Sequence, residues 1–401
     1  MSKLLQINVT ANWGSTGKIA EAIGICAIKQ GWESNIAYGR YSNPSQSHLI
    51  NISSTTETLL HYAAQRIIDN EGLCSKYSTR KLIKKIRRIN PDIIQLHNIH
   101  DHYLNYQLLF EYLNKTDIKV VWTFHDCWAF TGHCMHFVTK NCERWKSGCH
   151  HCPQKGEYPR TLLDRSAQNY DLKRSLFSAN KNLNIVACSD WIAEFVRESF
   201  LKEKKIQVIH NGVDLNVFKP ISANKDNNDN NDIFKILAVS NVWTKEKGLF
   251  DIYNLRELLP KDIEIVLVGV SAKQQKNLPD GVIGIQRTQN VGELVQLYNE
   301  ANILINPTYA DTFPTVNLEA LACGTPVITY NTGGSPEAID ENTGIVVPQG
   351  DITTLVLAIL KLKQEPLSSE ACRKRAELYF DKDKCFKQYI NLYNELISSQ
   401  K

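Results

Sequence analysis

The sequence predicts an α/β protein with two Rossmann-like domains in tandem, and three observations lead to this prediction. Short apolar runs of strand length alternate with segments of helical periodicity along most of the chain, as in βαβ units. The chain has 401 residues, which is more than one hydrophobic core usually holds. The opening KLLQINVTANWGSTGK, a strand followed by a polar loop with Trp and then Gly–Lys at a helix start, is echoed by FKILAVSNVWTKEKG.

The order of elements follows from the same patterns. Strands of the first half are expected at residues 4–9, 34–38, 93–96, 120–123 and 185–187. The Asn/Asp-rich stretch KPISANKDNNDNNDIFK then predicts a linker at residues 219–232. After FKILAV, further strands are expected at residues 263–268, 282–285, 303–306, 327–330 and 345–347. The domains would therefore span residues 1–218 and 233–380, with a final helix at 381–401.

Composition narrows the class of protein. A net charge of +4 is too mild to indicate nucleic-acid binding. No apolar run approaches the ~18–20 residues that span a bilayer, and the start enters a strand without a signal-peptide pattern. We therefore expect a cytoplasmic protein whose eleven cysteines are mostly reduced.

The stretch NWGSTGKIAEAI follows the first strand and opens a helix. It is not a P-loop, because Asn12 stands where the first glycine is required and Ile19 where the magnesium-binding hydroxyl is required. Gly14 and Gly17 still allow backbone N–H groups to approach an anion at the helix N-terminus. The alternative is a turn that needs its glycines for geometry alone.

The most informative stretch is NPTYADTFPTVNLEALACGTPVITYNTGGSPEAI, residues 306–339. A strand is followed by a loop with Asp311 and by a helix that carries Glu319 eight positions later. Thr312, Phe313 and Pro314 lie at the expected helix start, where free N–H groups favour an anion. Phosphate at these amides and sugar hydroxyls at the carboxylates would suit a sugar phosphate. The alternative is that Asp311 caps the helix and Glu319 is solvated.

Taken whole, this stretch resembles the second-domain motif of the family 4 (group 1) retaining glycosyltransferases of GT-B fold, including those of bacterial exopolysaccharide and colanic-acid clusters. The family's E-x7-E motif, its A-x-G-x-P-V-I run and its G-G turn with a further Glu are matched by Asp311, Glu319, Ala322, Gly324, Pro326, Val327, Ile328, Gly333, Gly334 and Glu337. The departure is Asp311, where most of the family has Glu. VIHNGVDLNVF resembles the family's hinge-side strand end, and AVSNVWTKEKGLFD resembles the loop whose Arg and Lys hold the donor diphosphate. Lys247 matches that Lys, whereas Asn241 occupies the Arg position.

The resemblance implies two domains that face each other across a cleft, with the final helix packed back on the first domain. It implies a transferase that moves a sugar, with retention, from a nucleoside diphosphate to a glycan or lipid-linked saccharide in bacterial surface polysaccharide synthesis, without a catalytic metal or another cofactor. His125, Asp311 and Lys247 would be catalytic, and Glu319 would hold the ribose. The donor would further contact Gly14, Gly17, Asn241, Thr312, Phe313 and Pro314.

Two alternatives stay open. One is a UDP-sugar epimerase of the same fold, and the other is a zinc-containing nucleic-acid-binding protein built on the cysteines and a basic helix. The second would leave residues 306–339 unexplained.

A cysteine-rich insertion is expected at about residues 127–160. CMHFVTKNCERWKSGCHHCP contains Cys134, Cys142, Cys149 and Cys152, which in a reducing compartment suggest a structural zinc clip. The neighbouring imidazoles that could replace a thiolate are His133, His136, His150 and His151. Free buried thiols or disulfides are the alternatives.

STRKLIKKIRRINPD predicts a basic amphipathic helix. Leu82, Ile83, Ile86 and Ile89 share one face, and the cations from Arg80 to Arg88 surround it. Such a helix either rests on anionic lipid, which would make the protein peripheral on a membrane, or packs its apolar face on the sheet.

Overall fold

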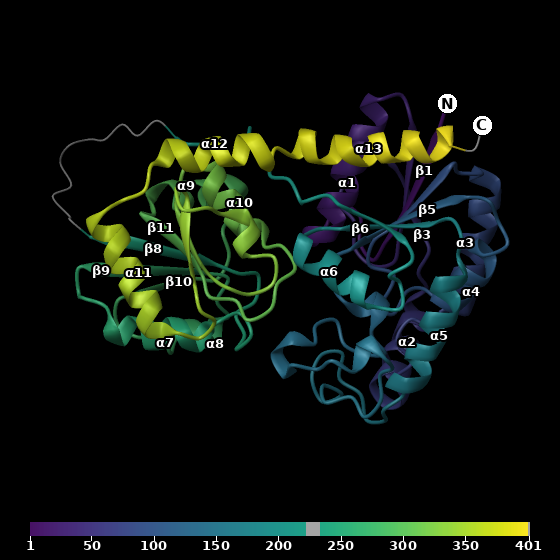
Figure 1. Cartoon of the computed structure of the whole chain (residues 1–401), viewed down its shortest axis with the longest axis horizontal. Coiled ribbons are helices and arrows are strands. Elements are labelled where there is room, and N and C mark those ends of the chain that lie inside the picture. The colour runs from purple at the N-terminus through teal and green to yellow at the C-terminus, as the bar shows by residue number, and fades with distance from the viewer. Residues whose placement is uncertain (222–232, 400–401) are drawn as a thin grey trace. The chain divides into compact units, whose positions relative to one another are not determined.

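The computed structural model describes residues 1–221 and 233–399. Its contacts divide the chain into two units, Met1–His210 with Phe386–Lys401 and Asn211–Cys385, and each is described by itself (Figure 1). The boundary thus lies eight residues before the predicted end of the first domain at 218. Of the predicted linker, only residues 219–221 lie within the described part of the chain.

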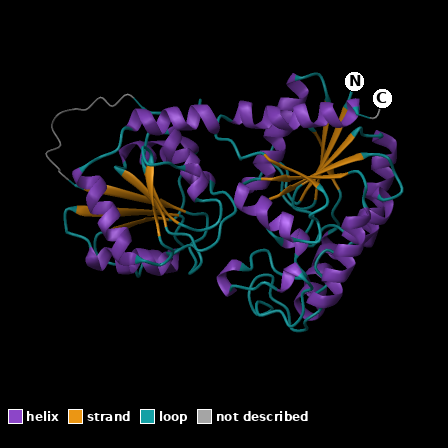
Figure 2. Ribbon diagram, in the orientation of Figure 1, coloured by secondary structure: helices purple, strands orange, loops and turns teal. Residues whose placement is uncertain are grey.

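The first unit is built on a parallel sheet (Figure 2). Among the described residues it has seven strands in the order β3-β2-β1-β4-β5-β6-β7. Their bounds are β1 Lys3–Asn8, β2 Glu33–Tyr38, β3 His48–Asn51, β4 Ile93–Leu96, β5 Lys119–Phe124, β6 Leu183–Ala187 and β7 Lys205–Val208. The helices of this unit are α1 Gly14–Lys29, α2 Thr55–Ile68, α3 Lys76–Ile89, α4 Tyr106–Leu113, α5 Ser166–Ala179 and α6 Asp190–Glu198.

The last helix, α13 (Lys382–Ser398), completes the core of the first unit. Its side chains Phe386, Tyr389, Ile390 and Tyr393 are buried at a spacing of three or four residues, which places them on one face of the helix. They pack with residues of α1 and of the central strands, and the Tyr393 hydroxyl donates to Gln95 Oε1 of β4 at 2.8 Å.

The second unit repeats the design with a parallel sheet, for which the described residues give six strands in the order β10-β9-β8-β11-β12-β13. The strands are β8 Phe234–Val239, β9 Ile263–Val268, β10 Val282–Ile285, β11 Ile303–Asn306, β12 Val327–Tyr330 and β13 Gly344–Val347. The helices are α7 Leu249–Leu258, α8 Ala272–Gln275, α9 Val291–Glu300, α10 Thr315–Ala322, α11 Ile352–Gln364 and α12 Ser369–Tyr379.

Each sheet reverses its strand order once, next to its first strand. In the first unit the reversal lies between β1 and β4, and in the second it lies between β8 and β11. Loops that leave neighbouring strands in opposite directions open a crevice at such a point, and ligands of open α/β sheets bind there. The loops after β1, β4, β8 and β11 therefore carry the candidate site.

The predicted α/β class and the predicted strands are confirmed, while two edge strands were missed. β3 and β7 are short, and most of their residues are at least partly exposed, so neither contains the apolar run that marks an inner strand.

The basic helix exists as α3, but its apolar face is buried in the first unit. Leu82 and Ile86 are fully buried, whereas the lysines and arginines around them are mostly exposed. Within the described residues, no helix combines the length and the apolar character that crossing a bilayer requires.

Candidate active site

In the second unit, the loops after β8 and β11 are joined by hydrogen bonds to one main-chain carbonyl. Tyr309 N donates to Glu246 O at 2.8 Å, and Thr308 Oγ1 donates to the same carbonyl at 3.4 Å. Gly248 ends the first loop with φ +79°, and a Cβ there would lie 2.2 Å from Pro307 O. Only glycine fits this position, so the two loops are held together at the switch point.

Lys247 and Asp311 meet because of this joint. Lys247 Nζ lies 2.8 Å from Asp311 Oδ2, although 64 residues separate them in the chain. The side chains keep 35% and 24% of their exposure, so the pair is open to solvent. Asp311 is also fixed by its neighbours: its Oδ1 accepts from Phe313 N at 3.2 Å, and its carbonyl accepts from Gly334 N at 3.3 Å.

The start of α10 lies directly after Asp311. Pro314 is the residue before the first turn, no side chain caps the helix, and the first turn has no acidic residue. No side chain of the described helix start therefore takes up the first amides of α10, although Asn317 N donates to Pro314 O at 3.3 Å. Thr312 and Phe313 are buried, and the Phe313 ring packs against Phe380 at 5.9 Å between centroids, which gives Phe313 a structural part in the unit's core.

Glu319 lies on α10 and is oriented by a buried tyrosine. The Tyr298 hydroxyl donates to Glu319 Oε2 at 2.8 Å, and Tyr298 is fully buried. Burial, together with the adjacent carboxylate, holds the pKa of Tyr298 well above its ordinary value, so the phenol stays a donor. The Glu319 carboxylate is thus oriented by a hydrogen bond and is not freely solvated. Asn241, in the loop after β8, is exposed.

In the first unit, the two glycines of the loop after β1 differ in their surroundings. A Cβ on Gly17 would lie 2.6 Å from Thr10 Oγ1, so Gly17 is required by the packing of its own loop. Gly14 has φ +64° and no atom within 4 Å of such a Cβ, which leaves its backbone approachable. The helix that it opens, α1, has neither a side-chain cap nor an acidic residue in its first turn.

His125, directly after β5, belongs to a cluster of histidines at the carboxyl ends of β4 and β5. Its Nε2 lies 3.1 Å from His97 Nδ1, and the two rings are stacked. Next to them His100 Nε2 lies 2.9 Å from Asp126 Oδ2. His97, His100, His125 and Asp126 line one cavity.

Burial and charge divide this cluster into a neutral and a charged pair. Burial lowers the pKa of His125 to about 4 and that of His97 well below its ordinary value, so both rings are neutral near pH 7. Burial alone would lower the pKa of His100, but the Asp126 carboxylate raises it. Burial would likewise raise the pKa of Asp126, yet the charge of His100 lowers it to about 2. His125 can therefore exchange hydrogen bonds without carrying a charge.

Sequence reasoning singled out His125 but missed His97 and His100. The signal was present, because HNIHDH follows the strand at 93–96 just as HD follows the strand at 119–124. Adjacent parallel strands bring such polar ends to the same edge of a sheet. Using this signal requires the neighbour relation of β4 and β5, which the sequence pattern alone did not supply.

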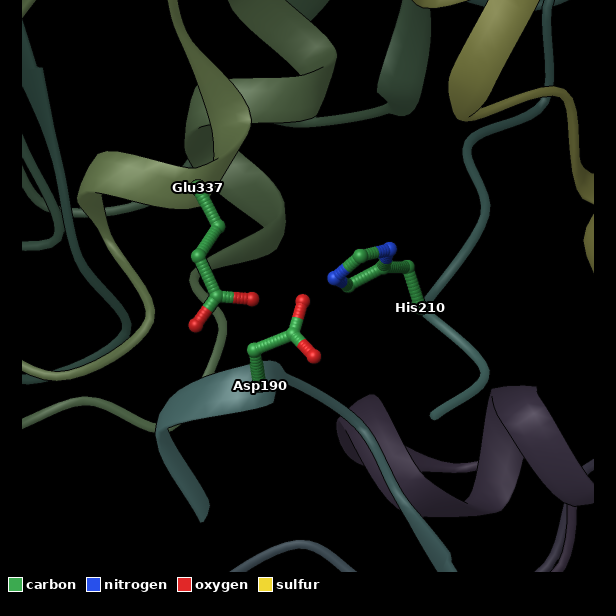
Figure 3. A group of neighbouring side chains, drawn as sticks. All are labelled: Asp190, His210 and Glu337. Carbon is green, nitrogen blue, oxygen red and sulfur yellow. The ribbon is translucent and has the colours of Figure 1, made fainter. Parts of the chain in front are cut away.

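Further polar residues follow β6 and β7 at the same sheet edge. Asp190 is the first residue of α6, and His210 comes shortly after β7 (Figure 3). Glu337, the third side chain drawn there, belongs to the second unit and lies on the short 3-10 helix Pro336–Ala338.

The four cysteines of the insertion gather in the first unit. Cys134, Cys142, Cys149 and Cys152 line one small cavity together with His133 and His150. All four are free thiols. The predicted metal ligands thus share one cavity, and none of them lines the histidine cavity. Among the described residues, no three of their sulfur atoms lie within 4.8 Å of one another.

Comparison with known proteins gives matches along nearly the whole chain. The family model described as Glycosyltransferase Family 4 matches residues 26–217, and the one described as Glycosyl transferases group 1 matches residues 221–379. A relative from Escherichia coli (strain K12), named "Putative colanic acid biosynthesis glycosyl transferase WcaC", is 24% identical over 98% of this chain and 100% of its own.

Two further matches bear on ligands. The N,N'-diacetylbacillosaminyl-diphospho-undecaprenol alpha-1,3-N-acetylgalactosaminyltransferase of Campylobacter jejuni is 28% identical over 52% of this chain and 59% of its own. Among solved structures, Anabaena Alr3699/HepE in complex with UDP aligns with a TM-score of 0.66 and 14% identity over 98% of this chain and 100% of that one.

Proposed function

The chain belongs to the group 1 glycosyltransferases of family 4 and is a nucleotide-sugar glycosyltransferase of surface polysaccharide synthesis, and we propose that its second unit holds the donor through Lys247, Asp311 and Glu319. Its two parallel-sheet units are those of the GT-B fold, and transfer with retention is the chemistry of this family. The observation that carries the proposal is the Lys247–Asp311 pair beside the uncapped start of α10, at the switch point of the sheet.

Charge development explains why these groups suit the reaction. Breaking the bond between sugar and phosphate leaves negative charge on the departing diphosphate. A cation and free amides placed at that charge lower the barrier, and the loss of one such donor costs about 10²–10³-fold in turnover. Lys247 supplies the cation, and the first amides of α10 supply the hydrogen bonds.

The resting ion pair does not oppose this role. A pair as open to solvent as Lys247–Asp311 contributes only ~0–1 kcal/mol. A doubly charged phosphate group can therefore take over Lys247 at little cost, which frees the Asp311 carboxylate for sugar hydroxyls. Glu319, held by Tyr298, accepts from the ribose hydroxyls.

On the first unit, the neutral His125 is proposed to contact the transferred sugar. Its neighbour His97 bonds Gln6 Oε1 through Nε2 at 3.1 Å, so the His125–His97 stack is anchored to β1. The His100–Asp126 pair lines the same cavity and supplies a cation–carboxylate dyad for an acceptor hydroxyl.

A lipid-linked acceptor is proposed on the strength of a second surface. α2 exposes Leu59, Leu60 and Ile67 by 68%, 64% and 52%. Leu162 and Leu163, also exposed, run along its end through main-chain bonds to Arg66 O and Ile67 O, both at 3.0 Å. We call these five side chains the α2 apolar surface.

The α2 apolar surface suits the interface of an anionic bilayer. Exposed apolar side chains flanked by cations are typical of such contacts, and Arg66 with Arg160 lies beside it. A relative whose name gives a diphospho-undecaprenol acceptor supports a membrane-bound substrate. The apolar face of α3 is buried, so α3 would contribute only its positive charges to binding of an anionic bilayer.

Lys247→Ala tests the donor site. We expect about 10²–10³-fold slower release of UDP from UDP-sugars in the presence of acceptor glycolipid, with an unchanged circular dichroism spectrum, because the side chain is part-exposed. Lys261→Ala is the matched control, since Lys261 is an exposed lysine of the same unit just before β9, at the opposite sheet edge. Turnover by Lys247→Ala equal to that of the control would remove Lys247 from the diphosphate site.

A further inference from the structure

The chain between β5 and α5 has little regular structure. Across residues 125–165 the described elements are three single-turn 3-10 helices, at Trp128–Phe130, Val138–Lys140 and Arg144–Lys146. A loop of this length inside a compact domain is uncommon, because few of its backbone groups are fixed by a helix or sheet. It needs other links to hold one conformation.

Four cysteine side chains of this loop line one cavity. The cavity lined by the four cysteines measures about 10 Å³, room for about one water-sized sphere. Cys134, Cys149 and Cys152 interact electrostatically with one another. Among the described residues, no three ligand atoms of this cavity lie within 4.8 Å of one another, so the side chains would close in on an ion as it binds. Cys149 Sγ accepts from Gly132 N at 3.2 Å, which ties it to the opposite side of the loop.

His133 lines the same cavity with a nitrogen that has no partner. The residue is 2% exposed, its Nδ1 lies 2.6 Å from Asp69 Oδ1, and its Nε2 is buried without a hydrogen bond. Such a buried orphan atom costs about 1–3 kcal/mol unless something binds it. An imidazole that donates one N–H to a carboxylate and presents the other nitrogen is the arrangement found at metal-bound histidines.

Asp69 is itself held in place. Its Oδ2 accepts from Arg165 N at 3.1 Å, and its carbonyl accepts from Asn169 Nδ2 at 2.8 Å. The C-terminal end of α2 and the start of α5 therefore fix the orientation of the His133 ring.

We propose that this loop binds one Zn²⁺ through Cys134, Cys149, Cys152 and the Nε2 atom of His133. Three thiolates and one imidazole are a known ligand set of closed, structural zinc sites. Soft sulfur ligands select zinc over magnesium, calcium or manganese. Cys142, which lines the same cavity, is left outside the ligand set, because the unpartnered His133 nitrogen supplies the fourth ligand.

The ion would order the acceptor side of the first unit and take no part in the chemistry. The loop starts at the histidine cavity, where Asp126 Oδ1 accepts from Trp128 N at 2.9 Å. Lys173 Nζ then holds the main chain at Trp128 O and Thr131 O, at 2.7 and 3.0 Å. A zinc ion at Cys134 would thus fix the segment that positions Asp126.

The first test is made on the unaltered full-length chain, purified under reducing conditions. Metal analysis should find about one zinc per chain, and X-ray absorption should give three sulfur ligands at ~2.3 Å and one nitrogen at ~2.0–2.1 Å. A preparation that holds no zinc and takes up none from added Zn²⁺ after reduction overturns the proposal. Four sulfur ligands would overturn the part given to His133.

Variants separate the ligands. Cys149→Ser, Cys152→Ser and His133→Asn should each weaken zinc binding by at least ~10-fold in competition with a chromophoric chelator. His133→Asn retains a donor for Asp69, so a purely structural histidine would leave zinc affinity unchanged. Cys142→Ser and Cys74→Ser, a half-buried thiol outside the loop, are the controls that should keep the ion. Loss of zinc in Cys142→Ser with retention in His133→Asn contradicts this ligand set.

Discussion

At the residue scale, a buried charge network holds the loop after β4 in an unfavourable backbone conformation. Asp101 and His102 have φ values of 83° and 70°, and non-glycine residues in this region cost about 1–3 kcal/mol each. His102 Nε2 lies 3.1 Å from Glu71 Oε2, and Arg40 Nη2 lies 3.1 Å from Asp101 Oδ1. The ion pairs therefore stabilise the strained turn that carries His100 into the site.

The pH dependence of this network can be derived from its pKa values. Burial alone would lower the pKa of His102, but Asp101 and Glu71 raise it from 6.5 to about 9. The contribution of His102 to the free energy of unfolding is therefore complete below pH 6.5 and is lost as the pH rises through about 9. Burial would raise the pKa of Glu71, but His102 lowers it from 4.5 to about 2, so that contribution is lost only as the pH falls from 4.5 through about 2.

Glu71→Gln should therefore destabilise the protein most between pH 4.5 and 6.5. Removing one member of a buried pair costs about 3–5 kcal/mol. We expect a loss of that size in urea unfolding at about pH 6, and a clearly smaller loss above pH 9, where His102 is neutral in both states. A loss that is equal at both pH values would show that charge plays no part.

At the element scale, two helices of the first unit differ in where their apolar side chains lie. α3 has the regular amphipathic pattern, yet its apolar face belongs to the core. α2 is less regular, and it is α2 that leaves leucines exposed. The proposed membrane contact through exposed apolar side chains therefore depends on α2.

Leu59→Ser with Leu60→Ser should reduce binding to vesicles that contain anionic phospholipid by more than 10-fold, because full burial of each leucine contributes about 1.5–3 kcal/mol. Leu357→Ser is the matched control, since Leu357 is 61% exposed on α11 of the second unit. Lys81→Ser with Lys84→Ser in α3 should change only the salt-sensitive part of binding. Cosedimentation at low and high salt measures both, and an undiminished affinity of the leucine variant would exclude the α2 apolar surface.

At the scale of the whole molecule, each unit has its own hydrophobic core. The core of the first unit includes the end of the chain, through Phe386, Tyr389, Ile390 and Tyr393. The core of the second is formed from residues between Phe234 and Leu362. Separate cores allow the units to unfold separately.

Calorimetry should therefore resolve two unfolding transitions that respond to different changes. UDP at 100 times its Kd should stabilise only the second unit, raising its free energy of unfolding by ~2.7 kcal/mol. Glu319→Ala should reduce this stabilisation. Ile390→Ala should destabilise only the first unit, lowering its free energy of unfolding by ~2–5 kcal/mol. Lys387→Ala, at an exposed position on the same helix, should leave that free energy unchanged. One transition that follows both changes would contradict independent units.

The sequence by itself determined the α/β class, the described strands other than β3 and β7, and the residues proposed to hold the donor. It could do so because alternation of apolar runs and turn residues is local, and because the 306–339 motif is specific. Tertiary structure decided the rest: the meeting of Lys247 with Asp311, the histidine cluster behind His125, the buried face of α3 and the edge strands β3 and β7. These depend on which strands become neighbours, and strand order is set by packing between segments far apart in the chain, which no local pattern records.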